Sequence, residues 1–111
     1  MTDRLTPAAA LRAIAAGDGR YGVLLSHGSM ELGAYAPRGS DPQSPHEQDE
    51  LYIVQAGSGY FRLEDERRPF ATGDVLFVPA GLEHRFEDFT DDFMAWVVFW
   101  GPAGGERDDH G

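Results

Sequence analysis

The chain has 111 residues, 41% of them hydrophobic, which suits one domain with one core. Nineteen acidic residues against nine arginines and no lysine give a net charge of −10, which argues against nucleic-acid and anionic-membrane partners, and the absence of cysteine excludes disulfides and thiolate metal sites. No apolar run approaches the roughly 18 residues of a membrane span, and no secretory signal pattern opens the chain, so we expect a cytoplasmic protein.

The first predicted element is a short helix. Thr6 is a good N-cap residue and Pro7 suits the first helical position. The alanine-rich segment 8–16 favours helix, and Gly17 provides a stop. Residues 1–20 therefore form an N-terminal helical extension in this interpretation.

From Tyr21 onward the hydrophobic pattern has a period of two, which is typical of strands. Glycine, proline and aspartate turns separate the strands at even spacing, and this arrangement predicts an antiparallel sandwich or barrel over 21–100. Residues 101–111 are rich in glycine and charge, and we expect a flexible tail there. The predicted strands cover 21–26, 30–36, 50–56, 60–64, a short segment ending at 70, 75–78, 84–89 and 93–100.

The last predicted strand is apolar on both faces. Phe93, Ala95, Val97 and Phe99 alternate with Met94, Trp96, Val98 and Trp100. One barrel interior can bury only one of these sets, so the other needs the N-terminal helix or a second subunit. We expect a homodimer, with coverage by the helix alone as the alternative.

Three side chains suggest a metal site. His46, Gln48 and Glu50 have the same parity on a predicted strand and can share a face, and His84 opens a different strand. Imidazole and carboxylate ligands suit Fe, Mn, Ni or Zn as a divalent ion. By residue type alone, these groups could equally be unrelated surface residues.

The spacing of glycine and proline around these residues resembles the two sequence motifs of the cupin superfamily. This resemblance implies a double-stranded β-helix, the jelly-roll or cupin barrel, which agrees with the all-β prediction. The second match is nearly complete. The matching segments are His46-x3-Glu50-x6-Gly57 and Gly73-x5-Pro79-Ala80-Gly81-x2-His84-x3-Asp88.

The resemblance implies one divalent metal ion held by His46, Glu50 and His84. Cupins usually supply a further histidine, whose place is taken here by Ser44. Water or a side-chain amide oxygen, from Gln43 or Gln48, could complete the set. Gln48 is preferred because it shares the predicted face of the other ligands.

A substrate pocket is expected next to the metal. Tyr52, Phe86 and Asp88 share faces with the ligands and are predicted to line it together with Gln43. The alternatives are core filling for Tyr52 and Phe86, and a strand-end turn for Asp88. The remaining histidines, expected outside the site, are His27 and His110.

Three functions fit these expectations. The first is a metal-dependent enzyme, a dioxygenase or an isomerase, that acts on a small organic molecule; its catalytic residues are unknown. The second is a non-catalytic cupin that binds a small molecule or a sugar with the metal as anchor. The third is a metal-free cupin with His84 as base, for which the carboxylate of Glu50 is awkward because burying it unpaired is costly.

Overall fold

The computed structural model describes residues 4–107. The helix α1 spans Pro7–Ala16, and Thr6 caps it by accepting a hydrogen bond from the Ala9 amide at 3.1 Å. The predicted helix is therefore confirmed within one residue. His110 lies outside the described residues.

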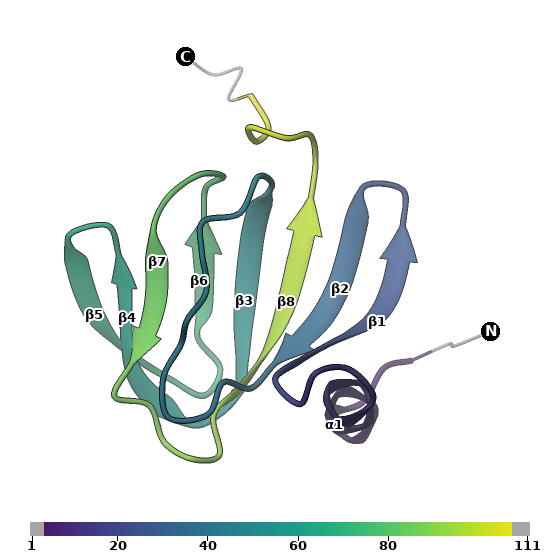
Figure 1. Ribbon diagram of the computed structural model, residues 1–111, viewed down its shortest axis with the longest axis vertical. Helices are drawn as coiled ribbons and strands as arrows, with labels where there is room; N and C mark the ends of the chain where they lie inside the picture. The colour runs from purple at the N-terminus through teal and green to yellow at the C-terminus, as the bar shows by residue number, and fades with distance from the viewer. Residues whose placement is uncertain (1–3, 108–111) are drawn as a thin grey trace.

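Within residues 4–107, eight strands follow in two antiparallel sheets (Figure 1). One sheet has the strand order β1-β2-β8-β3-β6, and the other has the order β5-β4-β7. The all-β prediction is confirmed, with strand ends shifted by at most two residues. The strands are β1 (Tyr21–His27), β2 (Met30–Tyr35), β3 (Asp49–Ala56), β4 (Ser58–Leu63), β5 (Glu66–Ala71), β6 (Val75–Val78), β7 (His84–Glu87) and β8 (Met94–Trp100).

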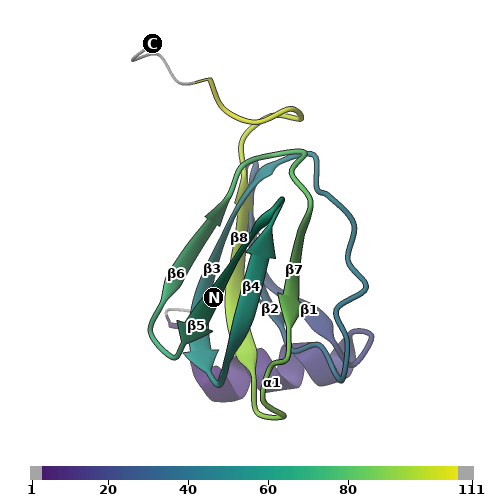
Figure 2. The ribbon, with the colours of Figure 1, turned by 90° about the vertical axis from the view of Figure 1, so that its left-hand side faces the viewer.

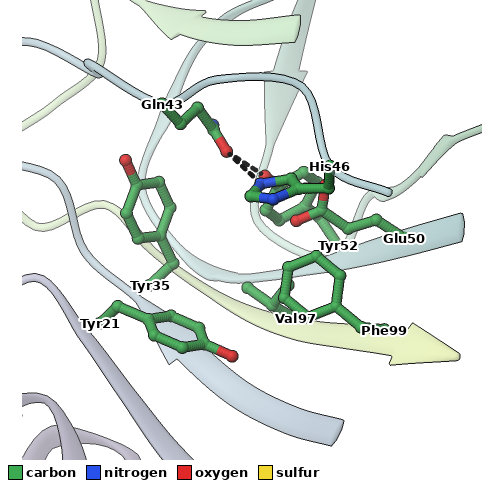
Figure 3. Close-up of a pocket in the computed structure, with 8 residues that line it drawn as sticks. All are labelled: Tyr21, Tyr35, Gln43, His46, Glu50, Tyr52, Val97 and Phe99. Atoms are coloured by element: carbon green, nitrogen blue, oxygen red, sulfur yellow. Dashed lines mark hydrogen bonds and ion pairs between the residues drawn. The ribbon is translucent and has the colours of Figure 1, made fainter. Parts of the chain in front are cut away.

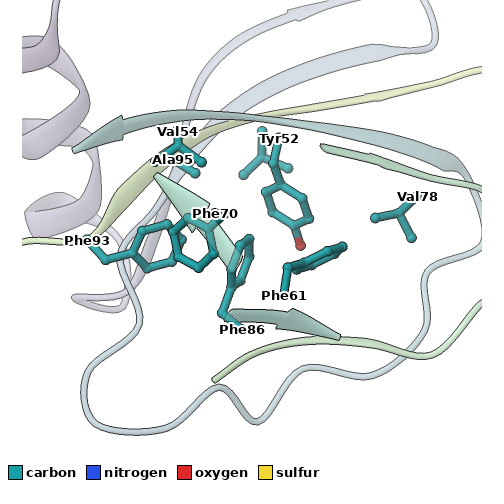
Figure 4. Packing of buried hydrophobic residues seen from close by; sticks show 9 residues of the cluster. Tyr52, Val54, Phe61, Phe70, Val78, Phe86, Phe93 and Ala95 are labelled. Carbon is teal, nitrogen blue, oxygen red and sulfur yellow. The ribbon is translucent and has the colours of Figure 1, made fainter. Parts of the chain in front are cut away.

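The main core lies between the two sheets and is dense in aromatic rings (Figure 4). Phe86 is its centre: its ring lies 4.6 Å from that of Phe93 and 4.8 Å from those of Tyr52 and Phe61, between centroids. Such close, tilted pairs add to the stability that area burial provides. The prediction that Phe86 lines the substrate pocket was wrong, because these rings enclose it on the core side.

Helix α1 closes the opposite face of the larger sheet at one end, at the foot of the molecule in Figure 2. Ile14 and Ala10 pack against Ala34 of β2 and Met94 of β8, and Trp96 joins this second cluster in part. The two faces of β8 are therefore both used, as its sequence required. Beyond Trp96, the outward side chains of β8 lie past the reach of the helix cluster.

The tight turns include two of the motif glycines. Gly57 and Gly73 have φ of 95° and 94°, in the left-handed region that glycine adopts without strain. Asp88 also has a positive φ, 49°, and is exposed, with its carboxylate 2.5 Å from the Arg67 guanidinium. Its expected place in the pocket was therefore wrong, and the strand-end turn alternative is the one observed.

The start of the C-terminal segment is attached to the sheet. The Gly104 amide donates to the Glu47 carbonyl at 2.7 Å, and the Glu106 amide donates to the carboxylate of Asp49 at 2.9 Å. No helix in residues 4–107 is long and apolar enough to cross a membrane.

Candidate metal centre

Three elements converge on the site. Glu50 points inward from β3, His84 opens β7, and His46 comes from the loop between β2 and β3. The amide of Gly81 donates to the His46 carbonyl at 2.8 Å, which fastens that loop to the turn before β7. This bond joins the two motif segments and sets the two histidines side by side, with ring centroids 5.2 Å apart.

The distances fit a shared metal ion. The Nε2 atom of His84 lies 3.1 Å from Oε1 of Glu50, and Nε2 of His46 lies 3.9 Å from the same oxygen. One ligand atom from each of the three residues lies within 4.8 Å of the others. Ligand atoms that each lie ~2.0–2.2 Å from one metal ion are separated by about 3–3.5 Å. Only small side-chain movements separate this arrangement from a coordinated one.

The hydrogen bonding of His84 leaves its inner nitrogen available to a metal ion when the ring is neutral. Its Nδ1 lies 3.0 Å from the Leu82 carbonyl, to which it can only donate. In the neutral ring, Nε2 then carries the lone pair, the tautomer seen in metal-bound histidines whose other nitrogen is hydrogen-bonded. That lone pair faces two oxygens at 3.1 Å, Oε1 of Glu50 and Oε1 of Gln43.

Within the protein, Glu50 finds a partner only when His84 is protonated. Its side chain is 1% exposed, and Oε1 has no hydrogen-bond partner in the described structure although His84 is close. A buried acceptor without a partner destabilises a fold by roughly 1–3 kcal/mol. A cation between the histidine lone pairs and this oxygen would satisfy all of them, so the residues fit a divalent metal.

Gln43 adds a fourth candidate donor atom, its amide oxygen (Figure 3). Its Oε1 lies 3.3 Å from Nε2 of His46 and accepts a hydrogen bond from the Tyr52 hydroxyl at 2.9 Å. Its Nε2 donates to the buried carboxylate of Asp41 at 2.6 Å. Because an anion can only accept from the amide NH2, these contacts fix the oxygen end of the amide toward the two histidines.

Gln48, preferred in the sequence analysis as the additional ligand, does not reach the cluster. Its Nε2 donates to the carbonyls of Ser29 and Gly101, at 3.2 and 2.9 Å. The preference was wrong because β3 begins at Asp49, so residues 46 and 48 are not on a strand and the parity argument does not apply to them. Gln48 instead ties the β1–β2 turn to the end of β8.

A cavity of about 280 Å³ opens beside the cluster and is lined by two of its members, His46 and Glu50. Of the expected pocket residues, Gln43 and Tyr52 line it. Sequence reasoning missed the other side of the cavity, where Tyr21 and Tyr35 face Phe99. Those two tyrosines gave no distinguishing signal, because an inward aromatic on a strand reads equally well as core.

The two histidines differ in their environments. Burial lowers the pKa of His46, and the nearby Glu50 carboxylate offsets this only in part. Burial also acts to lower the pKa of His84, but Glu50 and the Leu82 carbonyl outweigh it, so that pKa is raised. The lowered pKa of His46 favours the neutral ring, which is the form that binds metals.

The fold and the donor cluster together define a small β-barrel protein with a metal-type His-His-Glu site. Residues 32–100 match the model of the cupin domain, and the chain belongs to this family. The first sequence expectation, a small single-domain cupin, is thereby confirmed.

Known proteins support the same assignment. The chain is 39% identical over 90 residues to an uncharacterized protein of Streptomyces coelicolor, covering 79% of this chain and 86% of that one. It is 41% identical over 54 residues to acireductone dioxygenase of Schizosaccharomyces pombe, covering 44% of this chain but only 30% of the enzyme. Among solved structures, a Cupin 2 conserved barrel domain protein from Salinispora arenicola has a TM-score of 0.66 at 28% identity, covering 91% of this chain and 89% of that one.

Proposed function

We propose that the protein holds one divalent transition-metal ion between His46, Glu50 and His84 and uses it to act on a small organic molecule. The observation that carries this proposal is the buried Glu50 oxygen, which has no hydrogen-bond partner while His84 is neutral and lies 3.1 Å from Nε2 of that ring. Two imidazoles and one carboxylate with open positions are the donor set of many non-haem iron(II) oxygenases.

Gln43 is proposed as the additional oxygen donor in place of Gln48. Its carbonyl oxygen is within 3.3 Å of both histidine nitrogens, and its orientation is fixed by Asp41 and Tyr52. An amide oxygen is a neutral donor, so the set would carry one negative charge from Glu50 and leave a bound divalent ion with net positive charge. Such an ion can polarise a hydroxyl or carbonyl oxygen of a ligand.

The residues around the ligands have separate roles in this proposal. Tyr52 holds the Gln43 oxygen at the site, while Val97 and Phe99 give the cavity an apolar wall that limits water. His46 is the most accessible of the ligands, with 35% of its side chain exposed, and lies where the cavity meets solvent. The partial similarity to acireductone dioxygenase favours dioxygen chemistry over isomerisation.

Manganese titration followed by electron paramagnetic resonance tests the metal site, because free Mn²⁺ gives a signal that bound ion loses. We expect one ion per chain in the wild type and a loss of tight binding in His84→Ala. His27→Ala is the matched control, since His27 is an exposed histidine of the β1–β2 hairpin. Equal binding by all three proteins would contradict the proposed site.

Activity separates the enzyme from a binding module. The iron(II)-loaded protein should consume dioxygen in the presence of small enediols and hydroxyketones. Rearrangement of these compounds without oxygen uptake would indicate an isomerase. Tight binding with neither reaction would support the alternative function, a cupin that uses its metal only as an anchor.

A further inference from the structure

We infer that the end of the ligand farthest from the metal is neutral or cationic and carries hydrogen-bond donors, so that the site disfavours molecules with a distal carboxylate or phosphate. This inference rests on the proposed metal site. It is carried by the hydrogen bonds of the three tyrosines that line the cavity.

All three phenol protons are already donated to protein acceptors. The Tyr21 hydroxyl donates to Glu31 at 2.8 Å, the Tyr35 hydroxyl to Asp41, and the Tyr52 hydroxyl to Gln43 at 2.9 Å. A phenol has one proton, so only oxygen lone pairs remain to meet a ligand. The cavity therefore offers acceptors, and it calls for a ligand that brings its own O–H or N–H groups.

The charge around the cavity acts in the same direction. Its mouth continues into a hollow of about 430 Å³ lined by Glu31 and Glu47 beside His46. Among residues 4–107, no arginine lines the cavity or this hollow, and the chain contains no lysine. Arg20, whose charge acts on the Tyr35 hydroxyl, lies outside both linings.

An anionic group of the ligand near Tyr21 and Glu31 would lose its hydrating water and face only hydrogen-bond acceptors and carboxylates. Burying a charge without a partner is far more costly than burying a neutral polar group. A hydroxyl or an ammonium group would instead find the oxygens of Tyr21 and Glu31. The neighbouring Val97 and Phe99 suit an apolar body of about one ring in size between this end and the metal.

Catechols offer a matched series of probes, because they keep one metal-binding diol and vary the charge at the other end. The probes are 4-methylcatechol, 4-(2-aminoethyl)catechol and 3,4-dihydroxybenzoate, titrated calorimetrically and without oxygen into the Mn²⁺-loaded protein. We expect the methyl and aminoethyl compounds to bind at least tenfold more tightly than the benzoate. Glu31→Gln should reduce the advantage of the amine, whereas Glu66→Gln, an exposed carboxylate paired with Arg68, should not.

The outcomes distinguish the two proposals. If the benzoate binds as tightly as the methyl compound, the inference about ligand charge is overturned while the metal site stands. If no catechol binds, or if all bind His84→Ala equally well, the inference about the ligand is overturned, and the manganese titration decides separately whether the metal site stands. If Glu31→Gln leaves the order and spacing of affinities unchanged, the assigned role of Glu31 is wrong.

A second inference comes from the outer face of the larger sheet, away from the cavity. An apolar row crosses all five strands there, following the pairings Leu25–Leu32, Leu32–Val98, Val98–Leu51 and Leu51–Phe77. The next position adds Ile53 paired with Val75, and the Trp100 ring stacks on that of Phe77 at 6.1 Å. We call these residues the outer patch: Leu25, Leu32, Leu51, Ile53, Val75, Phe77, Val98 and Trp100.

We propose that a second copy of this chain covers the outer patch. Phe77, Val75 and Leu25 are 51%, 58% and 42% exposed, and the patch contains no charged side chain. The patch spans the width of the five-stranded sheet, which is about 19 Å at about 4.8 Å between neighbouring strands. A standard interface buries roughly 800 Å² per partner. In a chain of net charge −10, this uncharged face is where two like-charged copies can approach. A two-fold contact would set the same patch against itself.

Light scattering with size exclusion tests this interface. The wild type at micromolar concentration should have twice the 12.2 kDa mass of one chain, and Phe77→Glu should return it to one. Leu11→Glu is the control, because Leu11 is 55% exposed on α1 and lies outside the patch; it should remain a dimer. A monomeric wild type, or a dimer that survives Phe77→Glu, would overturn the proposal.

Discussion

Replacing Glu50 by Gln should have opposite effects on stability in the metal-free and the metal-bound protein. The two side chains have nearly the same shape, but glutamine has no charge and can donate. In the metal-free protein, the wild-type carboxylate is 1% exposed, with one oxygen lacking a hydrogen-bond partner, at a cost of roughly 1–3 kcal/mol. At alkaline pH, where His84 is neutral and cannot donate to Glu50, the metal-free variant should therefore be at least as stable as the metal-free wild type.

Metal changes the order. At a free concentration one hundred times the dissociation constant, binding stabilises the folded state by about 2.7 kcal/mol. At about 4 °C per kcal/mol for a domain of this size, the wild-type midpoint should rise by about 10 °C. The variant should gain much less. The wild type should therefore have the lower or equal melting midpoint in chelator and the higher one in metal. Equal midpoint shifts in both proteins, or a variant that is markedly less stable in chelator at alkaline pH, would contradict a metal ion bound by Glu50.

Three further predictions concern other parts of the molecule. Gln43→Ala should weaken Mn²⁺ binding about tenfold or more, while Gln48→Ala, with the amide bound elsewhere, should leave the binding curve unchanged. Gly22→Ala should lower the free energy of unfolding in urea by roughly 1–3 kcal/mol, because its Cβ would lie 2.0 Å from the carbonyl oxygen of Ala13 in α1; wild-type stability would contradict the packing. The Arg67 guanidinium, and with it Arg62, lowers the pKa of Glu87 in the folded protein. The ionised Glu87 therefore stabilises the fold fully above the pKa that it has in the unfolded chain, and this stabilisation is lost as the pH falls through the folded pKa. Glu87→Gln should flatten the acid side of the plot of melting midpoint against pH, and an unchanged slope there would contradict this.

The sequence motifs predicted the site where local geometry follows from local residues. The turn at Gly81 and the strand positions of Glu50 and His84 are encoded by short segments, and they lie as expected. The parity argument failed for Gln48 because side chains alternate regularly only within a strand, and β3 begins at Asp49, the residue after Gln48. His46 reaches the cluster through a loop hydrogen bond to Gly81, not through strand parity.

The loop before β3 also hides the residue that organises the site. Asp41 is 3% exposed and accepts from the Tyr35 hydroxyl, the Gln43 amide and the Phe86 backbone amide. Loops have no periodicity, so nothing in the sequence marks an aspartate between Ser40 and Pro42 as buried. Its importance comes from contacts with residues up to 45 positions away, which only the folded chain brings together.

We propose above all that one divalent metal ion lies between His46, Glu50 and His84. The most direct measurement is a crystal structure of the Mn²⁺-loaded protein with diffraction data collected on both sides of a manganese absorption edge. We expect one strong anomalous peak within bonding distance, ~2.0–2.3 Å, of an imidazole nitrogen of each histidine and an oxygen of Glu50. If solution measurements show that the protein has bound manganese but the map has no peak among these three residues, the proposed site is contradicted.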